Sequence, residues 1–255
     1  MWQMRVVNLD LDNTLIYSYK HDIGNRKMNV ERYQGREISF MTEKTHELLR
    51  QIKSRCLVVP TTTRTKEQYD RIDLKAGAFQ YALVCNGGVL LVNGQKDYAW
   101  HEESRRMISD CAGELRRGAE LLKCEPLRKF ELRFVEELFL FTKCSEPQRV
   151  AASLRTALDS RKVDVFHNGE KVYVVPGKLN KGAAVERFRR YVGADEVIAA
   201  GDSEFDMSMA ERADVGIVPA GFCKRYGADS ALEEMKGESI FSEEMLSRIK
   251  ELIDL

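Results

Sequence analysis

Residues 5–14 have the sequence Arg-Val-Val-Asn-Leu-Asp-Leu-Asp-Asn-Thr, a short apolar run that ends in two aspartates, Asp10 and Asp12. The run is typical of a buried β-strand, and the acidic residues follow where the strand would end. Two further apolar runs, residues 56–59 and 81–85, show no polar alternation and are separated by predicted helices. Strands covered on both faces and alternating with helices indicate a parallel sheet. This part of the chain therefore predicts an α/β, Rossmann-like core.

The pattern changes after Asn86-Gly87-Gly88, where hairpins with Asn-Gly turns at Asn93-Gly94 and Asn168-Gly169 alternate with helical stretches. The α/β alternation resumes near residue 181, with apolar strands at 197–200 and 215–218. We therefore expect an α/β core domain of residues 1–88 and 179–255, interrupted by an inserted α+β cap domain of residues 89–178. The polar segment 17–40 predicts an extended flap or hairpin, and a mobile surface loop is equally consistent with it.

Composition excludes several classes of protein. The 255 residues contain 40 Lys+Arg and 40 Asp+Glu, a formal charge of zero that argues against a nucleic-acid binder. No apolar run has the length of a membrane span. The N-terminus lacks a signal-peptide pattern, and the six cysteines are scattered without CxxC spacing. We expect a cytoplasmic protein with reduced thiols, a disulfide set being the alternative, while the oligomeric state stays undetermined.

Polar clusters follow the predicted strands, and ligands of open parallel sheets bind beyond the carboxyl ends of strands. The clusters are Asp10-Leu11-Asp12, Thr61-Thr62-Thr63-Arg64, Lys181 at a helix start, and Gly201-Asp202 with Asp206. Carboxylates that converge repel one another unless a cation neutralises them, and oxygen ligands favour Mg²⁺. A hard cation, a lysine and several hydroxyl or amide donors form a site for a phosphoryl group.

The spacing of the two N-terminal aspartates suits covalent catalysis. Asp10 lies at the predicted strand tip, where a carboxylate can attack phosphorus. Asp12, two residues on, falls on the same side of an extended chain. It is placed to protonate the leaving oxygen and later to activate water.

The order Asp-x-Asp-x-Thr, strand-Thr, Lys-Gly and Gly-Asp-x-x-x-Asp resembles the haloacid dehalogenase superfamily over essentially the whole chain. It is most similar to the phosphatase branch with a large α+β cap inserted after the third core strand, which includes sugar-phosphate phosphatases. The resemblance implies that Asp10 is the nucleophile, Asp12 the general acid/base, and Lys181 the group that stabilises charge on Asp10 and the phosphoryl oxygens. It implies a Mg²⁺ site formed by Asp10, the backbone carbonyl of Asp12, Asp202 directly, and Asp206 directly or through water.

The same resemblance implies that Thr62 binds the phosphoryl group and that Asn86-Gly87 lies at the cap entrance. This sequence departs from the pattern because Thr63 replaces a glycine, so the choice between Thr61 and Thr62 stays open. Phe205 also stands where many members have asparagine. Arg64 is a candidate substrate contact, and a surface position is equally consistent with it.

Together these features predict a Mg²⁺-dependent phosphomonoesterase acting on a small phosphorylated metabolite, most plausibly a phosphosugar, with the cap setting specificity. Neither nucleic acid nor membrane is an expected partner. One alternative is a phosphosugar mutase, which would need cap arginines for a second phosphate, and Arg133 is the candidate on a predicted strand. A second alternative is a non-catalytic protein that binds a phosphate ligand.

Overall fold

The computed structural model describes residues 4–228 and 231–254, which form two compact units. The first unit contains the described residues of 4–96 and 181–254, and the second contains residues 97–180. The second unit begins at Asp97, whereas the sequence pattern predicts an inserted domain from residue 89. Strands β7 (Val89–Val92) and β8 (Gln95–Lys96) pair with β6 (Tyr81–Val84) through backbone hydrogen bonds and so belong to the first unit. The inserted unit ends at Asn180 rather than at residue 178.

A five-stranded parallel sheet forms the centre of the first unit. Its order is β15 (Glu233–Glu234), β14 (Val215–Val218), β13 (Glu196–Ala200), β1 (Arg5–Leu9) and β5 (Leu57–Pro60). The side chains of residues 6–9 in β1 are buried on both faces, as the mainly apolar sequence of the strand predicts. Strand β6 follows β5 through one parallel bridge between Thr61 and Leu83. The predicted α/β fold class is confirmed.

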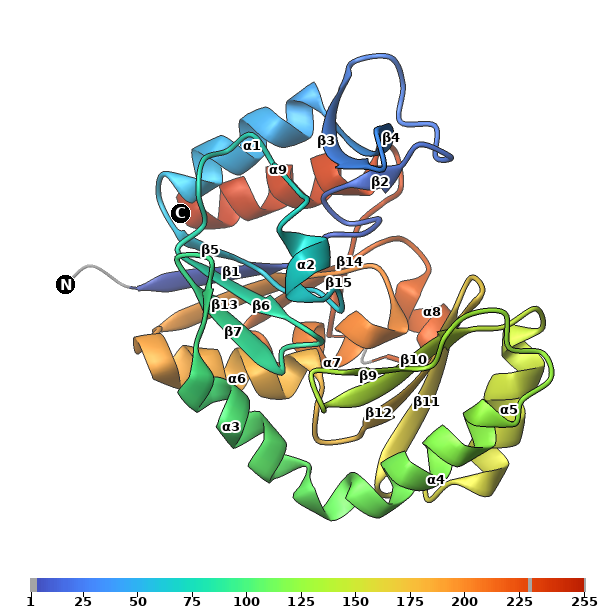
Figure 1. Cartoon of the computed structure of the whole chain (residues 1–255). Helices are drawn as coiled ribbons and strands as arrows, with labels where there is room; N and C mark the ends of the chain where they lie inside the picture. Colours follow the sequence, from blue (N-terminus) through green and yellow to red (C-terminus); the bar gives the residue numbers. More distant parts are fainter. Residues whose placement is uncertain (1–3, 229–230, 255) are drawn as a thin grey trace. The chain divides into compact units, whose positions relative to one another are not determined.

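Helices cover both faces of this sheet (Figure 1). Helices α1 (Glu43–Lys53) and α9 (Phe241–Asp254) lie on one face, and α6 (Lys181–Val192) and α7 (Glu204–Arg212) lie on the other. Leu49 of α1 and Ile249 of α9 are fully buried in one apolar cluster with Val7 of β1. Helices shorter than these, α2 (Lys66–Tyr69) and α8 (Phe222–Tyr226), follow β5 and β14.

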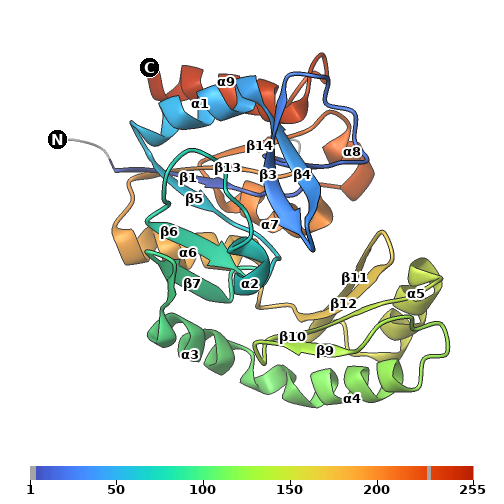
Figure 2. The ribbon, with the colours of Figure 1, turned by 45° about the horizontal axis from the view of Figure 1, so that its top comes forward.

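The segment after β1 forms a small antiparallel sheet rather than an irregular loop (Figure 2). It consists of β2 (Tyr17–Ser18), β3 (Lys27–Tyr33) and β4 (Arg36–Thr42), in the order β2-β4-β3. The predicted hairpin is therefore confirmed. The β3–β4 register shifts on both sides of Glu31, and this bulge breaks the alternation of the strand. Val30 and Glu31 are consequently both buried although they are neighbours.

The second unit is a four-stranded antiparallel sheet with helices packed on it. The chain order is α3 (Tyr98–Met107), η1 (Ser109–Cys111), α4 (Ala112–Lys123), β9 (Arg133–Val135), β10 (Phe139–Lys143), α5 (Pro147–Ala157), β11 (Val163–Asn168) and β12 (Lys171–Pro176). The sheet order is β11-β12-β10-β9. Leu115 of α4 and Leu154 of α5 join Leu140 and Val174 of the sheet in one core. This composition of elements matches the predicted α+β module.

All six cysteines have free thiols, so the alternative of a disulfide set is wrong. No helix in the described ranges has both the length and the apolar character that crossing a bilayer requires.

Candidate active site

Three aspartates from two distant parts of the chain meet at the carboxyl ends of β1 and β13. Asp10 follows β1, Asp202 follows β13, and Asp206 lies in the first turn of α7. Each offers a carboxylate oxygen within 4.8 Å of the others. The backbone N–H of Asp10 donates to the carbonyl of Ala200 (3.0 Å), which extends the pairing of the two strands into the site. The structure thus brings together three of the four predicted carboxylates.

Lys181, the first residue of α6, is the cation inside this cluster. Its side chain is almost completely buried, and Nζ donates to Oδ1 of Asp10 (2.5 Å) and to Oδ1 of Asp206 (2.5 Å). Burial disfavours the charged lysine, but the two carboxylates outweigh this effect and raise its pKa above the ordinary value. Lys181 is therefore a permanent positive charge beside Asp10.

Asp206 organises the site rather than facing solvent. Its second oxygen, Oδ2, accepts hydrogen bonds from the backbone N–H of Asp202 (3.2 Å) and from both N–H (2.9 Å) and Oγ (2.8 Å) of Ser203. The side chain is fully buried. With Oδ1 on Lys181 as well, Asp206 fixes the lysine and the loop that carries Asp202 at the same time.

Two glycines allow these elements to approach closely. A Cβ atom on Gly201 would lie 2.3 Å from Cγ of Asp206, and one on Gly182 would lie 2.2 Å from the backbone oxygen of Ser208. The N–H of Gly182 also donates to Oγ of Ser208 (3.1 Å), which joins α6 to α7. Glycine is therefore required in the Gly-Asp and Lys-Gly motifs because no room exists for a Cβ atom, and not because of the backbone conformation.

The cluster carries more negative charge than Lys181 balances. Burial and the neighbouring Asp206 raise the pKa of Asp202 to about 7. Burial, followed by Asp206, also raises the pKa of Asp10 well above its usual range, although Lys181 acts against this. Buried carboxylates that repel one another and offer only oxygen ligands fit a hard divalent cation such as Mg²⁺. The donor set therefore agrees with the expected metal site.

The structure separates the roles of the three threonines after β5. Oγ1 of Thr61 accepts from the side-chain amide of Asn8 (2.9 Å) and donates to the carbonyl of Val59 (3.1 Å), so its hydrogen bonds stay within the sheet. Oγ1 of Thr62 accepts from the N–H of Arg64 (3.2 Å). Among the described residues, the hydroxyl proton of Thr62 has no hydrogen-bond acceptor. This favours Thr62 over Thr61 as the phosphoryl ligand, and Thr63 lies half-buried beside it.

Asp12 and Arg64, predicted as separate site residues, form one ion pair. Nε and Nη2 of Arg64 donate to Oδ2 and Oδ1 of Asp12, both at 2.7 Å. A third donor, Nη1, reaches Glu31 (2.8 Å). The guanidinium is thus engaged by two carboxylates here, and a direct contact between Arg64 and substrate stays a prediction.

The predicted Asn86-Gly87 pair lies in the turn between β6 and β7. Both residues have positive φ angles, 58° and 84°. The N–H of Asn86 donates to the carbonyl of Thr62 (3.0 Å), which connects this turn to the threonine loop. The pair therefore lies next to Thr62 within the first unit, and its role in binding stays a prediction.

Comparison with known proteins agrees with this arrangement. No protein-family model matches the chain. A phosphoglycolate phosphatase of Methanopyrus kandleri is 25% identical over 213 residues, which cover 81% of this chain and 88% of that protein. The structure is similar to sucrose-phosphatase of Synechocystis sp. PCC6803, solved with sucrose and phosphate, with a TM-score of 0.69 and 16% identity over 100% of this chain and 99% of the other. A haloacid dehalogenase-like hydrolase of Bacteroides thetaiotaomicron matches with a TM-score of 0.57 and 17% identity over 97% and 100% of the two chains.

This chain therefore has the fold of haloacid dehalogenase-like hydrolases. The four motifs, the parallel sheet and the inserted antiparallel unit agree with the resemblance found in the sequence.

Sequence reasoning missed the partners of two site residues. Thr14 donates from Oγ1 to Oδ1 of Asp202 (3.1 Å), and its place in the Asp-x-Asp-x-Thr motif is the available signal. Glu31 reaches Arg64 from the polar segment 17–40, where nothing in the sequence distinguishes it from exposed acidic neighbours.

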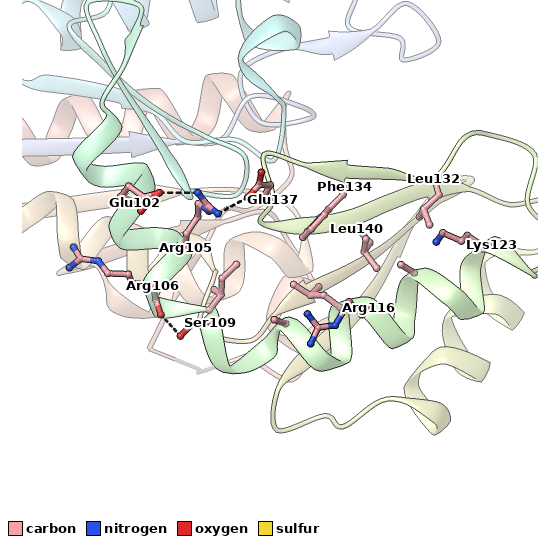
Figure 3. Close-up of a pocket in the computed structure, with 14 residues that line it drawn as sticks. Glu102, Arg105, Arg106, Ser109, Arg116, Lys123, Leu132, Phe134, Glu137 and Leu140 are labelled. Carbon is pink, nitrogen blue, oxygen red and sulfur yellow. Dashed lines mark hydrogen bonds and ion pairs between the residues drawn. The ribbon is translucent and has the colours of Figure 1, made fainter.

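A cavity of about 770 Å³ lies entirely within the inserted unit (Figure 3). Leu115, Leu132, Phe134 and Leu140 line it together with charged residues of α3 and α4. Arg105 pairs there with Glu102 (3.0 Å) and Glu137 (2.7 Å). None of the predicted site residues lines this cavity.

Proposed function

We propose that this protein is a Mg²⁺-dependent phosphomonoesterase that removes phosphate from a small metabolite, a phosphosugar, through an aspartyl-phosphate on Asp10. The observation that carries the proposal is the buried Lys181–Asp10 pair inside the three-carboxylate cluster. A surface ion pair or a helix cap needs neither this burial nor the convergence of three acidic groups.

The chemistry divides into two steps. Lys181 holds Oδ1 of Asp10, which leaves Oδ2 to attack phosphorus while the bond to the leaving oxygen breaks. Asp12 donates a proton to that oxygen, and the alcohol departs. Asp12 then takes a proton from a water molecule, whose oxygen attacks phosphorus and releases inorganic phosphate and the free Asp10 carboxylate. Thr62 donates a hydrogen bond to a phosphoryl oxygen in both steps.

The metal would be held by the carboxylates of Asp10 and Asp202 and by the backbone carbonyl of Asp12. Asp206 would act through its contacts to Lys181 and the Asp202 loop, because both of its oxygens already accept hydrogen bonds. When bound, the cation supplies positive charge that reduces repulsion between the carboxylates and the incoming phosphoryl group.

Two relatives suggest which substrates to assay first. The M. kandleri relative is named a phosphoglycolate phosphatase, and the Synechocystis structure holds sucrose and phosphate. These names differ in the size of the leaving alcohol. A panel should therefore contain phosphoglycolate, disaccharide phosphates and monosaccharide phosphates, each assayed for released inorganic phosphate with Mg²⁺ present.

The decisive variant is Asp10→Asn, which keeps the size of the side chain and removes its nucleophilic oxygen. We expect the release of phosphate to fall at least about 10³-fold while the fold survives. Asp73→Asn, an exposed carboxylate outside the site, is the matched control and should retain full activity. Full activity of Asp10→Asn would rule out a mechanism in which Asp10 is the nucleophile.

The same assay separates the alternatives. A mutase would release no phosphate without a bisphosphate activator, and its candidate cap arginine, Arg133, is exposed and paired with Glu131. A binding protein would show calorimetric binding of Mg²⁺ and a phosphate analogue without turnover.

A further inference from the structure

The proposed acid/base, Asp12, has a partner that selects its orientation. Its side chain is 49% exposed, whereas that of Arg64 is 13% exposed. An exposed aspartate normally samples several rotamers. The guanidinium of Arg64 donates two parallel hydrogen bonds to Asp12, both at 2.7 Å, and these bonds select a single rotamer of the Asp12 side chain. Arg64 therefore fixes the direction in which the Asp12 carboxylate points.

Arg64 is itself held by a buried carboxylate of the β3–β4 hairpin. The side chain of Glu31 is 0% exposed and accepts hydrogen bonds from Nη1 of Arg64 (2.8 Å) and Oγ of Ser39 (2.7 Å). Nε of Arg71 donates to the same carboxylate (3.2 Å). A buried charge of this kind is tolerated because it is fully paired.

The hairpin bulge explains how Glu31 reaches the site. An ideal strand would direct Val30 and Glu31 to opposite faces, so that one of them would be exposed. The register shifts around Glu31 allow Val30 to enter the apolar core while Glu31 turns toward Arg64. The hairpin, the loop after β5 and the loop after β1 are thereby joined by one chain of charged contacts.

We propose that Glu31 is a positioning residue for the acid/base step: by holding Arg64, it fixes the carboxylate of Asp12 in the orientation for proton transfer. This inference rests on the proposed function, because it assumes that Asp12 transfers the proton. The inference also gives the 17–40 segment a function, because its β3–β4 hairpin then orients the acid/base residue Asp12 rather than serving as a surface extension. Proton transfer depends steeply on such positioning.

The test compares two classes of substrate in Glu31→Gln, which keeps the size of the side chain and an oxygen for Ser39. An alkyl phosphate needs a proton on its leaving oxygen, whereas 4-nitrophenyl phosphate has a leaving group stable without one. We expect kcat/KM for the alkyl ester to fall about 10–100-fold and that for the aryl ester to fall less than about threefold. A loss of stability alone would lower both values by the same factor.

Asp12→Asn should show the same selective loss, and adding Glu31→Gln to it should cause no further decrease. Such non-additivity is expected when two residues act through one step. Glu37→Gln is the matched control, because Glu37 lies on the same hairpin and pairs with Arg32 rather than with Arg64. It should leave both substrates unaffected.

A second variant protects the test against misfolding of Glu31→Gln. Arg64→Lys keeps the positive charge but cannot form two parallel hydrogen bonds with Asp12, so it should reproduce the selective loss. An unchanged ratio of the two kcat/KM values in folded forms of both variants would overturn the positioning role and leave the proposed function intact. A wild-type protein that releases phosphate from neither ester would overturn the proposed function itself, and the positioning role with it.

Discussion

Nζ of Lys181 lies 2.5 Å from Oδ1 of Asp10, although 171 positions separate the two residues in the chain. The whole inserted unit, residues 97–180, lies between them in sequence. The ion pair is therefore formed only when the two segments of the first unit assemble. Because both side chains are buried, the pair links the stability of that unit to the chemistry of the site.

Replacing Lys181 should damage stability and activity together. In Lys181→Met, the carboxylates of Asp10 and Asp206 would be buried without their cation. We expect the free energy of unfolding of the metal-free protein to fall by about 3–5 kcal/mol, measured by urea denaturation. Phosphate release should fall about 10²-fold or more. Lys44→Met, an exposed lysine, is the control, and equal stability of the two variants would contradict the structure.

The site should make stability depend on pH and on Mg²⁺. The pKa of Asp202 is raised to about 7 and that of Asp10 is also raised, so the folded state binds more protons than the unfolded state above about pH 4. In the metal-free protein, these two carboxyl groups should therefore contribute to the free energy of unfolding at low pH, and this contribution should be lost as the pH rises through about 7. Mg²⁺ binds the ionised carboxylates of the folded state, so adding it should restore the lost stability at high pH.

Melting temperatures with and without Mg²⁺ at about pH 5 and about pH 8 check this dependence. We expect Mg²⁺ to raise the melting temperature more at the higher pH. An equal increase at both pH values would show that these carboxylates do not bind the ion. Asp202→Asn provides the internal control, because it should weaken the effect of Mg²⁺ at the higher pH.

The two adjacent threonines should respond differently to loss of the hydroxyl. Thr61→Val leaves the amide of Asn8 without its acceptor and should cost about 1–3 kcal/mol of stability, with kcat of the folded protein unchanged. Thr62→Val should lower kcat/KM about 10–100-fold with a small change in stability, because the missing hydroxyl would bind the phosphoryl group. Kinetics and thermal denaturation of both variants measure the contrast, and the reverse pattern would assign the phosphoryl contact to Thr61.

A methyl group should not be tolerated where α6 meets α7. Gly182→Ala would place Cβ 2.2 Å from the backbone oxygen of Ser208, and we expect a loss of about 1–3 kcal/mol or more, with reduced activity because Lys181 is adjacent. Gly113→Ala in α4 meets no atom within 4 Å. It should stabilise the protein by about 0.4–1 kcal/mol. Equal effects in chemical denaturation would contradict the close approach.

Much of the first unit follows from local patterns. The mainly apolar residues 5–9 and the apolar residues 57–59 predict buried strands, and the structure pairs them side by side in the parallel sheet. The Asn93-Gly94 turn predicts the β7–β8 hairpin, and both residues have positive φ angles. The predicted cap start at residue 89 differs from the start of the second unit at Asp97, since the pairing of β7 with β6 depends on a neighbour that the sequence pattern does not identify.

The helical stretch from about residue 102 to 124 shows another limit of periodicity. Its pattern predicts one helix, but the structure divides it into α3, the short η1 and α4. Oγ of Ser109 donates to the carbonyl of Arg106 (2.9 Å) and so competes with the helical hydrogen bonds at the break. The apolar spacing continues across the interruption, which is why the pattern alone does not reveal it.

The sequence by itself determined that polar groups follow successive strands, and parallel strands carry their carboxyl ends to one edge of a sheet. That rule was sufficient to predict that Asp10, Asp202 and Asp206 converge. Tertiary structure alone decided which carboxylate oxygens accept hydrogen bonds from Lys181 and that the hydroxyl of Thr61 bonds to Asn8. It also decided that the buried carboxylate of Glu31 accepts a hydrogen bond from Arg64. These contacts depend on a bulge, on the spacing between helices and on the direction of side chains. All three arise from packing between segments that are distant in the chain, so no periodic sequence pattern predicts them.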